Sequence, residues 1–413
     1  MKKNRVVIVG GGASGLMAAI QAARAGAEVT ILEHNDRVGK KILSTGNGKC
    51  NLTNLHMSED CYRGADPRFI RTVLNHFSQQ DAIDFFEELG IYPKVKNGYV
   101  YPRSEQASSV LDVLRLEADH QGVKTETGIH VEKIRPLKKG GLLAVESGDR
   151  RWEAEAVVLA AGSSAAPSSG SDGSGYELAK NLGHTIIRPL PALVQLRSDK
   201  NPVFRQLAGI RTEALVSLTV QEKLLASDRG ELQLTDYGIS GIPVFQVSRY
   251  ASRALADGKK VMAIVDFWPD LLEPQVEELL KKRCRNRPDK KAEDFLTGLF
   301  PKKLAQVLLK QAQIPLTASV GRMREEQLLD LSRQIKNFAV PITAVNPFAN
   351  AQVCCGGVAA SEIDPDTMES AICRGLYFAG EIMDVDGICG GYNLQWAWST
   401  GAIAGIHAGR NRT

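Results

Sequence analysis

A glycine-rich turn between an apolar segment and a helical pattern constrains this chain more than any other feature. Residues 5–9 (RVVIV) form a short, continuous, β-branched run, which is typical of a strand buried on both faces of a parallel sheet. Residues 10–15 (GGGASG) follow at once, and residues 16–26 (LMAAIQAARAG) have apolar side chains at helical spacing. Residues 28–33 (EVTILE) then indicate a second buried strand that ends in an acid. The sequence therefore predicts one complete βαβ unit.

The glycines of this turn match the pattern G-x-G-x-x-G, which binds the pyrophosphate of a dinucleotide. A chain with 38 glycines produces such spacings by chance, so the pattern gains its meaning from the strand before it and the helix after it. We expect Gly10 to permit the tight turn, Gly12 to let the backbone approach the pyrophosphate, and Gly15 to allow close helix–strand packing. Glu33 would accept hydrogen bonds from the ribose hydroxyls, and Ser14 lies within the same turn. The alternative is a glycine-rich turn that binds no ligand.

The C-terminal part of the chain decides between NAD and FAD, which both use this unit. Residues 375–381 (GLYFAGE) indicate an apolar strand that ends in a glycine and an acid, and a helix of small residues is expected at 393–408. Residues 156–162 (AVVLAAG) indicate a further strand whose end passes close to the dinucleotide. A sheet that starts at the N-terminus and is completed near the C-terminus is typical of FAD-binding proteins. The candidates in these segments are Ala161, Gly162, Gly380 and Glu381.

Four longer motifs resemble the signatures of the BaiN/YhiN-like flavoproteins, a family that includes a bile-acid ene reductase and an aminoacetone oxidase. The motifs are residues 40–54 (KKILSTGNGKCNLTN), 98–104 (GYVYPRS), 362–370 (EIDPDTMES) and 390–397 (GGYNLQWA). They occur in order and span essentially the whole chain. The resemblance implies an α/β protein with a Rossmann-like FAD-binding domain, an inserted β-barrel-like domain and a small helical domain.

The sequence supports this division into domains. We expect the FAD-binding domain at 1–190 plus 354–413, the β-barrel-like insert at 191–270 plus 335–353 as a cover for the substrate, and the helical part at 271–334. Alternating, strand-like stretches occur in the insert, whereas the helical part has Leu and Lys at helical spacing with prolines at its breaks. The strand-like stretches are 193–196, 214–220, 231–234 and 260–267.

The resemblance to the BaiN/YhiN-like family implies that residues 39–54, which follow the second strand, lie along the flavin. Two lysines could pair with pyrophosphate or flavin carbonyl charge, although surface lysines are the alternative, and two glycines could bring backbone N–H groups to the ring. Cys50 is alone, which argues against dithiol chemistry. The cofactor-binding candidates here are Lys40, Lys41, Gly46, Asn47, Gly48 and Asn51, and Val131 is a further one.

The helix that begins near residue 392 would direct its N-terminus at the pyrimidine edge of the flavin. The partial positive charge there would stabilise the negative charge that develops on reduction. Ordinary helix capping by Asn393 is the alternative. Asp384 and Asp386 are either acids close to the cofactor or residues of a loop turn. The candidates of this region are Asp384, Gly391, Tyr392, Asn393 and Gln395.

Catalytic chemistry is expected to belong to the flavin. The seven histidines have no metal-ligand spacing, no Ser-His-Asp set can be placed, and no metal is expected. Tyr101, Arg103 and Tyr392 are the candidate proton donors, because they lie in motif loops. Adjacent Cys354 and Cys355 are either a redox pair or two packed thiols.

These features predict an FAD-dependent oxidoreductase that transfers a hydride between the flavin and a small organic substrate. No second Rossmann unit is visible, so NADH or NADPH would bind only transiently as reductant. We favour a bile-acid-type enone reductase over a flavin amine oxidase of the aminoacetone type. A flavin-dependent RNA-modifying or redox-sensing protein is the alternative from another class, and its only support is the basic run at 281–291 (KKRCRNRPDKK).

Charge and hydropathy limit the partners. A net charge of +4 over 413 residues gives no electrostatic footprint for nucleic acid, so we expect no such partner. No apolar run approaches the length of a membrane helix, and the seven cysteines contain no C-x-x-C motif. The sequence therefore predicts a cytoplasmic protein without a membrane partner, and it leaves the oligomeric state open.

Overall fold

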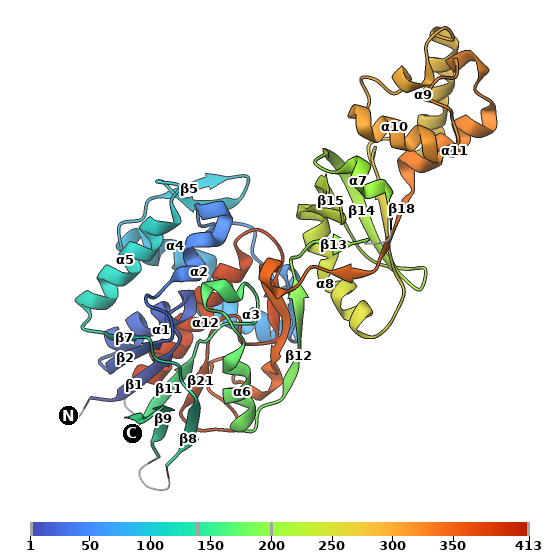
Figure 1. The fold of residues 1–413 in the computed structure, drawn as a ribbon. Helices are drawn as coiled ribbons and strands as arrows, with labels where there is room; N and C mark the ends of the chain where they lie inside the picture. The colour runs from blue at the N-terminus through green and yellow to red at the C-terminus, as the bar shows by residue number, and fades with distance from the viewer. Residues whose placement is uncertain (1–2, 138–140, 199–200, 411–413) are drawn as a thin grey trace. The chain divides into compact units, whose positions relative to one another are not determined.

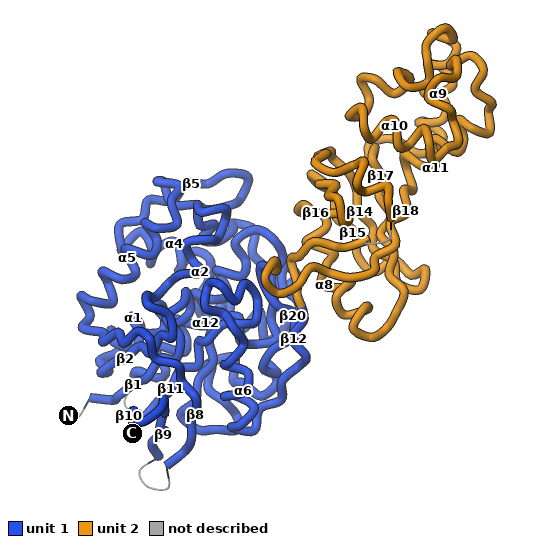
Figure 2. Tube along the Cα trace, viewed as in Figure 1, with its two compact units in different colours: residues 1–190, 352–413 blue, residues 191–351 orange. Residues whose placement is uncertain are grey.

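The structure, a computed structural model, describes residues 3–137, 141–198 and 201–410. The chain forms two compact units, which Figure 2 shows in different colours. Unit 1 comprises residues 1–190 and 352–413, and unit 2 comprises residues 191–351. The chain thus leaves unit 1, builds unit 2 and returns to complete unit 1.

A five-stranded parallel sheet forms the centre of unit 1. Its strand order is β21-β11-β1-β2-β7, so a strand from near the C-terminus lies at one edge (Figure 1). Side chains of β1 and β11 are buried on both faces, as their continuous apolar sequences require. This arrangement confirms the predicted Rossmann-like sheet. The strands are β1 (Arg5–Val9), β2 (Glu28–Glu33), β7 (Lys124–Thr127), β11 (Ala156–Leu159) and β21 (Leu376–Phe378).

Two parallel helices pack closely beside this sheet. Helices α1 (Ala13–Arg24) and α12 (Tyr392–Gly409) approach through three α12 glycines spaced four residues apart. A Cβ atom at Gly401, Gly405 or Gly409 would lie 2.5, 2.3 or 2.7 Å from the carbonyl oxygens of Ser14, Ala18 and Ala22. The two helices therefore run parallel, with Gly401 of α12 beside Ser14 at the start of α1. The nine residues of α12 that precede Gly401 extend beyond the N-terminus of α1.

The remaining helices and small sheets of unit 1 surround this centre. The helices are α2 (Lys40–Ser44), α3 (Pro67–His76), α4 (Gln79–Glu88), α5 (Ala107–His120) and α6 (Ser174–Asn181). Two sheets have three strands each, in the orders β3-β6-β5 and β10-β9-β8. Their strands are β3 (Thr53–Asn54), β5 (Pro93–Lys96), β6 (Tyr99–Pro102), β8 (Lys133–Pro136), β9 (Leu143–Ser147) and β10 (Arg150–Ala154). Strand β4 (Tyr62–Gly64) pairs with β22 (Val385–Gly387), and β12 (Ile186–Ala192) pairs with β20 (Val353–Val358).

Unit 2 contains a seven-stranded antiparallel sheet of order β18-β17-β14-β15-β16-β13-β19. Its two edge strands are separated along the chain only by Thr343, so the sheet curves until its ends meet, which makes it barrel-like. The 15-residue helix α8 (Ile242–Ala256) packs on this sheet and was not predicted from the sequence. The strands are β13 (Leu196–Arg197), β14 (Arg211–Val220), β15 (Lys223–Leu234), β16 (Gly238–Gly241), β17 (Val261–Asp266), β18 (Phe338–Ile342) and β19 (Ala344–Val345). A short helix, α7 (Val203–Leu207), precedes β14.

Three helices complete unit 2: α9 (Glu273–Asn286), α10 (Lys302–Gln311) and α11 (Glu325–Lys336). Their buried side chains belong to the same hydrophobic core as those of the sheet. Where α11 meets the sheet, the Lys336 ammonium lies 2.6 Å from the Asp266 carboxylate and donates to the carbonyl of Trp268. The division of this segment into a β-barrel-like insert and a separate helical domain stays a prediction.

Candidate functional site

The turn between β1 and α1 has the shape that a phosphate group needs. Gly10 has a φ angle of +100°, and a Cβ atom there would lie 2.5 Å from the carbonyl oxygen of Ala160. At Gly15 a Cβ would lie 1.9 Å from the Gly10 carbonyl oxygen, so neither position accepts a side chain. Gly12 differs, because no described heavy atom comes within 4 Å of its Cβ position. Among the described residues no side chain caps α1, which leaves its first amide groups available to an anion.

Glu33 ends β2 beside this turn and is almost fully buried. One carboxylate oxygen accepts a 2.8 Å hydrogen bond from the Gly11 amide. The other oxygen accepts from the backbone amide of Asn35 at 2.8 Å and from its side-chain amide at 2.6 Å. A carboxylate offers about four acceptor sites, so capacity remains for a hydroxyl group. Glu33 therefore orders the glycine turn, and its predicted contact with a ribose stays a prediction.

The segment after β7 returns past the same acid. The Ile129 amide donates to the Glu33 carbonyl at 2.9 Å, and Val131 is buried two residues later. Lys40 pairs at 2.7 Å with Asp36, whose side chain is 77% exposed. The Lys40 side chain is 27% exposed and also donates to Asn35 Oδ1 at 3.2 Å, so both its contact with the cofactor and the surface-lysine alternative stay open.

Lys41 and Glu381 form a second polar cluster. The Lys41 ammonium lies 2.6 Å from a carboxylate oxygen of Glu381, and the Ser163 hydroxyl donates to the same oxygen at 3.1 Å. Glu381 follows Gly380, whose φ angle is +80° and whose Cβ position lies 2.4 Å from the Ser14 hydroxyl. The end of the C-terminal strand therefore meets the start of α1, as the sequence predicted for the completed sheet.

The end of β11 lies against the same turn. The Cβ position of Gly10 is 3.0 Å from the Ala161 Cα atom. Gly162 has a φ angle of +76°, and a Cβ there would lie 2.6 Å from the Ser171 hydroxyl. Strands β1, β11 and β21 thus end at one edge of the sheet, beside the glycine turn, which is where ligands bind in open α/β folds.

Residues 45–51 form a turn with an unusual backbone. Gly46, Asn47 and Gly48 are exposed and have positive φ angles of 55°, 55° and 81°. Cys50 is buried, and burial raises the pKa of its thiol to about 12, so this cysteine stays protonated. Asn51 is 8% exposed, and among the described residues its carbonyl oxygen Oδ1 has no hydrogen-bond partner.

The N-terminus of α12 lies next to Asn51. The helix begins after Gly391, whose φ angle is +96° and whose Cβ position lies 3.1 Å from Asn51 Oδ1. Asn393 accepts a 2.8 Å hydrogen bond from the Gly387 amide and donates to the Gly387 carbonyl at 2.9 Å. The alternative that Asn393 caps its own helix is therefore wrong, because its side chain holds the preceding loop instead.

Gln395 is buried in a network of protein groups. Its Oε1 atom accepts from the Thr53 hydroxyl at 2.7 Å, and its Nε2 atom donates to the Ser399 hydroxyl at 3.0 Å. Gln395 thus holds β3 against α12, and a direct contact with a cofactor stays a prediction. Asp384 is also buried and accepts from the Gly356 amide at 2.8 Å, so it joins its loop to β20.

The three candidate proton donors occupy different surroundings. Tyr101 is half-buried, lies 3.8 Å from the Cβ position of Gly46, and has its pKa raised by burial. Tyr392 begins α12 and packs edge-to-face on Tyr62, with ring centroids 6.1 Å apart, and burial raises its pKa. The Arg103 side chain is exposed. Tyr101 is therefore the candidate nearest to the exposed turn at 46–48.

None of the seven cysteines, all of which lie in the described part of the chain, forms a disulfide bond, and Cys354 and Cys355 are adjacent residues of β20. Adjacent strand residues point to opposite faces of a sheet, so these two thiols are packed separately. Among the described residues, no cluster of His, Cys, Asp and Glu could hold a metal ion.

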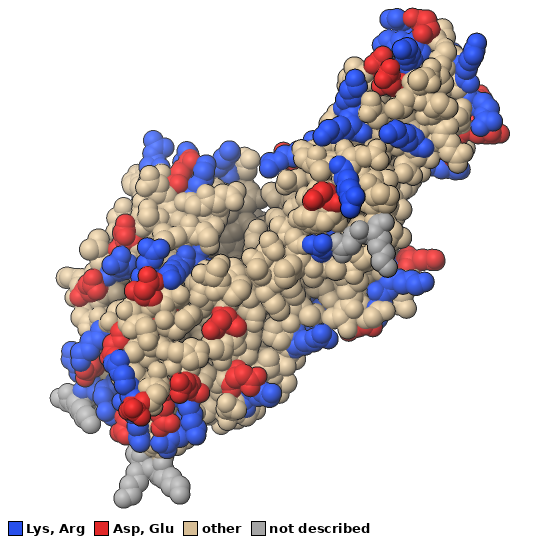
Figure 3. All heavy atoms as spheres, in the orientation of Figure 1, with Lys and Arg blue, Asp and Glu red and all other residues tan. Residues whose placement is uncertain are grey.

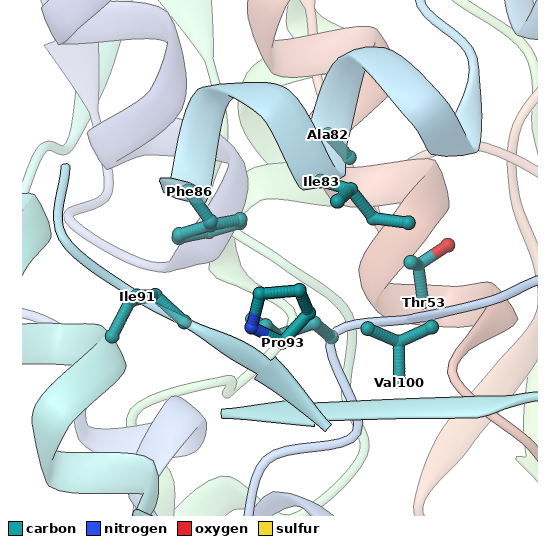
Figure 4. Close-up of a pocket in the computed structure, with 8 residues that line it drawn as sticks. Thr53, Ala82, Ile83, Phe86, Ile91, Pro93 and Val100 are labelled. Carbon is teal, nitrogen blue, oxygen red and sulfur yellow. The ribbon is translucent and has the colours of Figure 1, made fainter. Parts of the chain in front are cut away.

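A small apolar pocket lies beside the segment that carries Asn51 (Figure 4). It is formed by α4, by the ribbon of β5 and β6, and by the start of β3. Its lining contains no charged side chain, and its one hydroxyl, that of Thr53, donates to Gln395. The lining residues are Leu52, Thr53, Ala82, Ile83, Phe86, Ile91, Pro93 and Val100.

The basic run at 281–291 is partly compensated by nearby acids. Figure 3 shows basic and acidic side chains together over the helical part of unit 2. Three of the seven basic residues form ion pairs, and Arg283 donates to the carbonyls of Phe295 and Thr297. The pairs are Lys281 with Glu277 at 2.8 Å, Arg285 with Glu278 at 2.9 Å and Arg287 with Asp289 at 2.8 Å.

The fold and the site together define a dinucleotide-binding flavoprotein. The HI0933-like protein Rossmann domain matches residues 4–407, and the chain belongs to this family. It is 48% identical to the "3-dehydro-bile acid delta(4,6)-reductase" of Clostridium scindens over 97% of this chain and 98% of that protein. It is 29% identical to the "Ribosomal RNA dihydrouridine synthase" of Haemophilus influenzae over 98% of each chain. A solved 3-ketosteroid-Δ4-(5α)-dehydrogenase from Rhodococcus jostii RHA1 is 17% identical, with a TM-score of 0.49, over 99% of this chain and 97% of that one.

The chain is accordingly an FAD-dependent oxidoreductase, as the sequence predicted. The residues present fit the cofactor, because Gly12 leaves open space at a helix N-terminus and Asn51 keeps a buried acceptor without a donor. Within the described residues, no helix is long and apolar enough to cross a membrane.

Several residues of the site were missed at the sequence level. Gly11 and Asn35 hold Glu33, and Ser163 supports Glu381. Thr53 joins β3 to α12 through Gln395. Gly11 lies within the glycine pattern and could have been predicted from it. The other contacts join residues that are not part of a common sequence motif, so the sequence alone did not indicate them.

Proposed function

We propose that this protein reduces a carbon–carbon double bond conjugated with a carbonyl group, in a 3-oxo bile acid or a similar small molecule, with NADH or NADPH as the reductant. The observation that carries the proposal is the 48% identity, over nearly the full length of both chains, to a relative named as a 3-dehydro-bile acid delta(4,6)-reductase. Such a double bond accepts a hydride readily because the carbonyl group takes up the resulting negative charge.

The residues of unit 1 would bind and orient the cofactor. Bound FAD supplies the hydride chemistry, which no side chain can supply. The turn at Gly12 would receive the pyrophosphate, and Glu33 would receive the ribose hydroxyls. Lys41 would approach the pyrophosphate through its position beside Glu381.

The N-terminus of α12 would stabilise negative charge. The helix begins at Tyr392, after Gly391, without a side-chain cap among the described residues, so its first amide groups can donate to a carbonyl oxygen. The partial positive charge of these groups favours the reduced, anionic state of a nearby ring. Asn393 supports this arrangement by fixing the loop before the helix at Gly387.

A proton must reach the substrate after the hydride. Tyr101 is the donor that we favour, because its half-buried phenol, which is protonated at neutral pH, lies 3.8 Å from the Cβ position of Gly46. Its position beside Gly46 puts it at an exposed turn that a substrate could approach. Arg103 and Tyr392 stay weaker candidates. Unit 2 would cover the substrate and exclude water, and removal of residues 271–334 should then lower turnover without removing FAD.

A second candidate function is the reduction of a uracil base in ribosomal RNA. Two relatives with 29% identity, from Haemophilus influenzae and Escherichia coli, are named ribosomal RNA dihydrouridine synthase. Among the described residues, nine basic side chains of the helical part have no ion pair; Arg283 donates to backbone carbonyls and Lys310 to Gln206. The other seven have no such bond in the described part of the chain and could contact phosphates. They are Lys282, Lys290, Lys291, Lys302, Lys303, Arg322 and Arg324. The expectation of no nucleic-acid partner therefore stays a prediction, as does the cytoplasmic location.

Anaerobic half-reactions separate these candidates. The FAD-loaded protein is reduced with NADH or NADPH and mixed with a 3-oxo bile acid that carries double bonds at positions 4 and 6, or with ribosomal RNA. In a separate experiment the oxidised protein is mixed with aminoacetone in the presence of oxygen, because an amine donates its electrons to the oxidised flavin. Fast reoxidation by the bile acid supports the proposal. Faster reoxidation by RNA, with steep salt dependence, would favour the second candidate, and oxygen turnover that requires aminoacetone would favour an amine oxidase.

A further inference from the structure

Residues 51–54 run alongside the N-terminal half of α12, and three of the four are bonded to it or to its approach. The Asn54 side-chain amide donates to the Gly390 carbonyl at 3.0 Å, and the Thr53 hydroxyl donates to Gln395 at 2.7 Å. The indole N–H of Trp398 donates to the Leu52 carbonyl at 2.9 Å. These bonds fix the segment against the helix.

Asn51 differs from the other three residues of the segment 51–54, because in the described structure its side-chain carbonyl oxygen is not bonded to the helix. It is 92% buried, yet its Oδ1 atom has no hydrogen-bond partner among the described residues, and it lies 3.1 Å from the Cβ position of Gly391. Buried carbonyl oxygens are almost always paired, because burial removes the hydrogen bonds that water would make. The neighbours of Asn51 hold the segment in place, so the side chain is presented to the helix N-terminus with an open acceptor.

The group that fits this position must carry an N–H next to a carbonyl. Beside Asn51 Oδ1, the first amide groups of α12 are donors, and Gly391 provides no side-chain cap for them. Asn51 Oδ1 can accept from an N–H group, and the amides of α12 can donate to a neighbouring carbonyl oxygen. An imide, in which an N–H lies between two carbonyl groups, offers both. The pyrimidine ring of an oxidised flavin has such an edge, and so does a uracil base.

The packing of α1 on α12 favours the flavin. Gly401 contacts Ser14 in the first turn of α1, and Tyr392 begins α12 nine residues earlier. At a rise of 1.5 Å per residue the helix start lies roughly 13 Å beyond the phosphate-binding turn. A ribityl chain and a flavin ring span such a distance.

We propose that Asn51 Oδ1 accepts a hydrogen bond from the N3–H group of the flavin, while the first amides of α12 bind the adjacent C2 carbonyl. Asn51 is then the residue that recognises the oxidised imide edge and sets the orientation of the ring. This inference rests on FAD as the bound cofactor.

The test compares FAD with N3-methyl-FAD, in which the imide N–H is replaced. Apoprotein is titrated with both compounds by calorimetry, for the wild type, Asn51→Ala, Asn51→Asp and the control Asn97→Gly, an exposed turn residue with a φ angle of 51°. The wild type and the control should bind FAD at least about tenfold more tightly than N3-methyl-FAD, the scale of one lost buried hydrogen bond. Asn51→Ala should bring the two affinities together, whereas Asn51→Asp, which keeps an acceptor, should retain the preference and lower the midpoint potential of the bound flavin.

Each outcome decides the matter. Equal binding of both compounds by the wild type, or an unchanged preference in Asn51→Ala, would overturn the inference while leaving FAD binding intact. Lower thermal stability of Asn51→Ala apoprotein with an unchanged preference would assign Asn51 a purely structural role. Asn51-dependent binding of uridine monophosphate to FAD-loaded protein would transfer the contact to the substrate. Failure of every variant to bind FAD would instead refute the proposed function.

Discussion

Replacement of Glu33 tests the dinucleotide site at a buried acid that accepts three hydrogen bonds from the protein. In Glu33→Ala, the Gly11 amide loses its 2.8 Å acceptor and Asn35 loses two hydrogen bonds. A bound ribose would lose a hydrogen bond to a charged group, which contributes about 1.5–3 kcal/mol. Since about 1.4 kcal/mol corresponds to a tenfold change in affinity, FAD should bind roughly 10- to 150-fold more weakly.

The assay is titration of apoprotein with FAD, followed by the quenching of flavin fluorescence. Glu33→Gln should fall between the wild type and Glu33→Ala, because an amide keeps one acceptor oxygen and loses the charge. The matched control is Glu28→Ala at the other end of the same strand, where an exposed carboxylate pairs with Lys124 at 2.7 Å. An FAD affinity in Glu33→Ala within about twofold of the control would refute the role of this acid, since one charged hydrogen bond is worth more than that.

Three further perturbations test the packing and the electrostatics, each by unfolding in urea. Gly405→Ala should destabilise unit 1 by about 1–3 kcal/mol, because overpacking at 2.3 Å from the Ala18 carbonyl outweighs the gain of roughly 1 kcal/mol in helix propensity, and a more stable variant would contradict this packing. Lys336→Met should cost about 3–5 kcal/mol, because the Asp266 carboxylate, 16% exposed, loses its ion-pair partner. Adding Asp266→Asn should recover only the share due to the unpaired charge, since the carbonyls of Trp268 and Leu271 still lack the Lys336 donor, and equal stability of the two variants would contradict the ion pair. Burial lowers the pKa of His184 below 6.5, so the unfolded chain binds the proton first, and stability should fall as the pH drops below about 6.5 towards the folded pKa. That pH dependence should weaken in His184→Gln, and an unchanged profile would exclude His184 as its source.

Local sequence patterns predicted the centre of unit 1 well. The bounds of β1 and β2 agree with the predicted segments 5–9 and 28–33, because continuous β-branched runs end at glycines or at an acid. Helix α12 begins one residue before the predicted position, since the two glycines that precede it stop any earlier helix. In these cases a residue type and its immediate neighbours determine the backbone.

Other features depend on contacts that no local pattern carries. Helix α8 was missed because the sequence of the insert was interpreted by its alternating stretches, and the strand expected at 193–196 is instead β13 at Leu196–Arg197. The bond between Thr53 and Gln395 joins residues 342 positions apart. The open acceptor of Asn51 likewise depends on the position of Gly391 in space, which a single sequence does not reveal.

The most direct test of the central claim is a stoichiometric reoxidation under anaerobic conditions. The bound FAD is reduced with a limiting amount of dithionite, and a 3-oxo bile acid with double bonds at positions 4 and 6 is added in small portions while the flavin absorbance is recorded. The claim requires recovery of the oxidised spectrum with two hydrogen atoms added to the bile acid for each flavin reoxidised. That is one equivalent of bile acid per flavin and a gain of two hydrogen atoms where one double bond is reduced, or half an equivalent and a gain of four where both are, as mass spectrometry reports. A spectrum that stays reduced with excess bile acid, in protein that oxygen reoxidises normally, would contradict the assignment of this chain as an enone reductase of the bile-acid type.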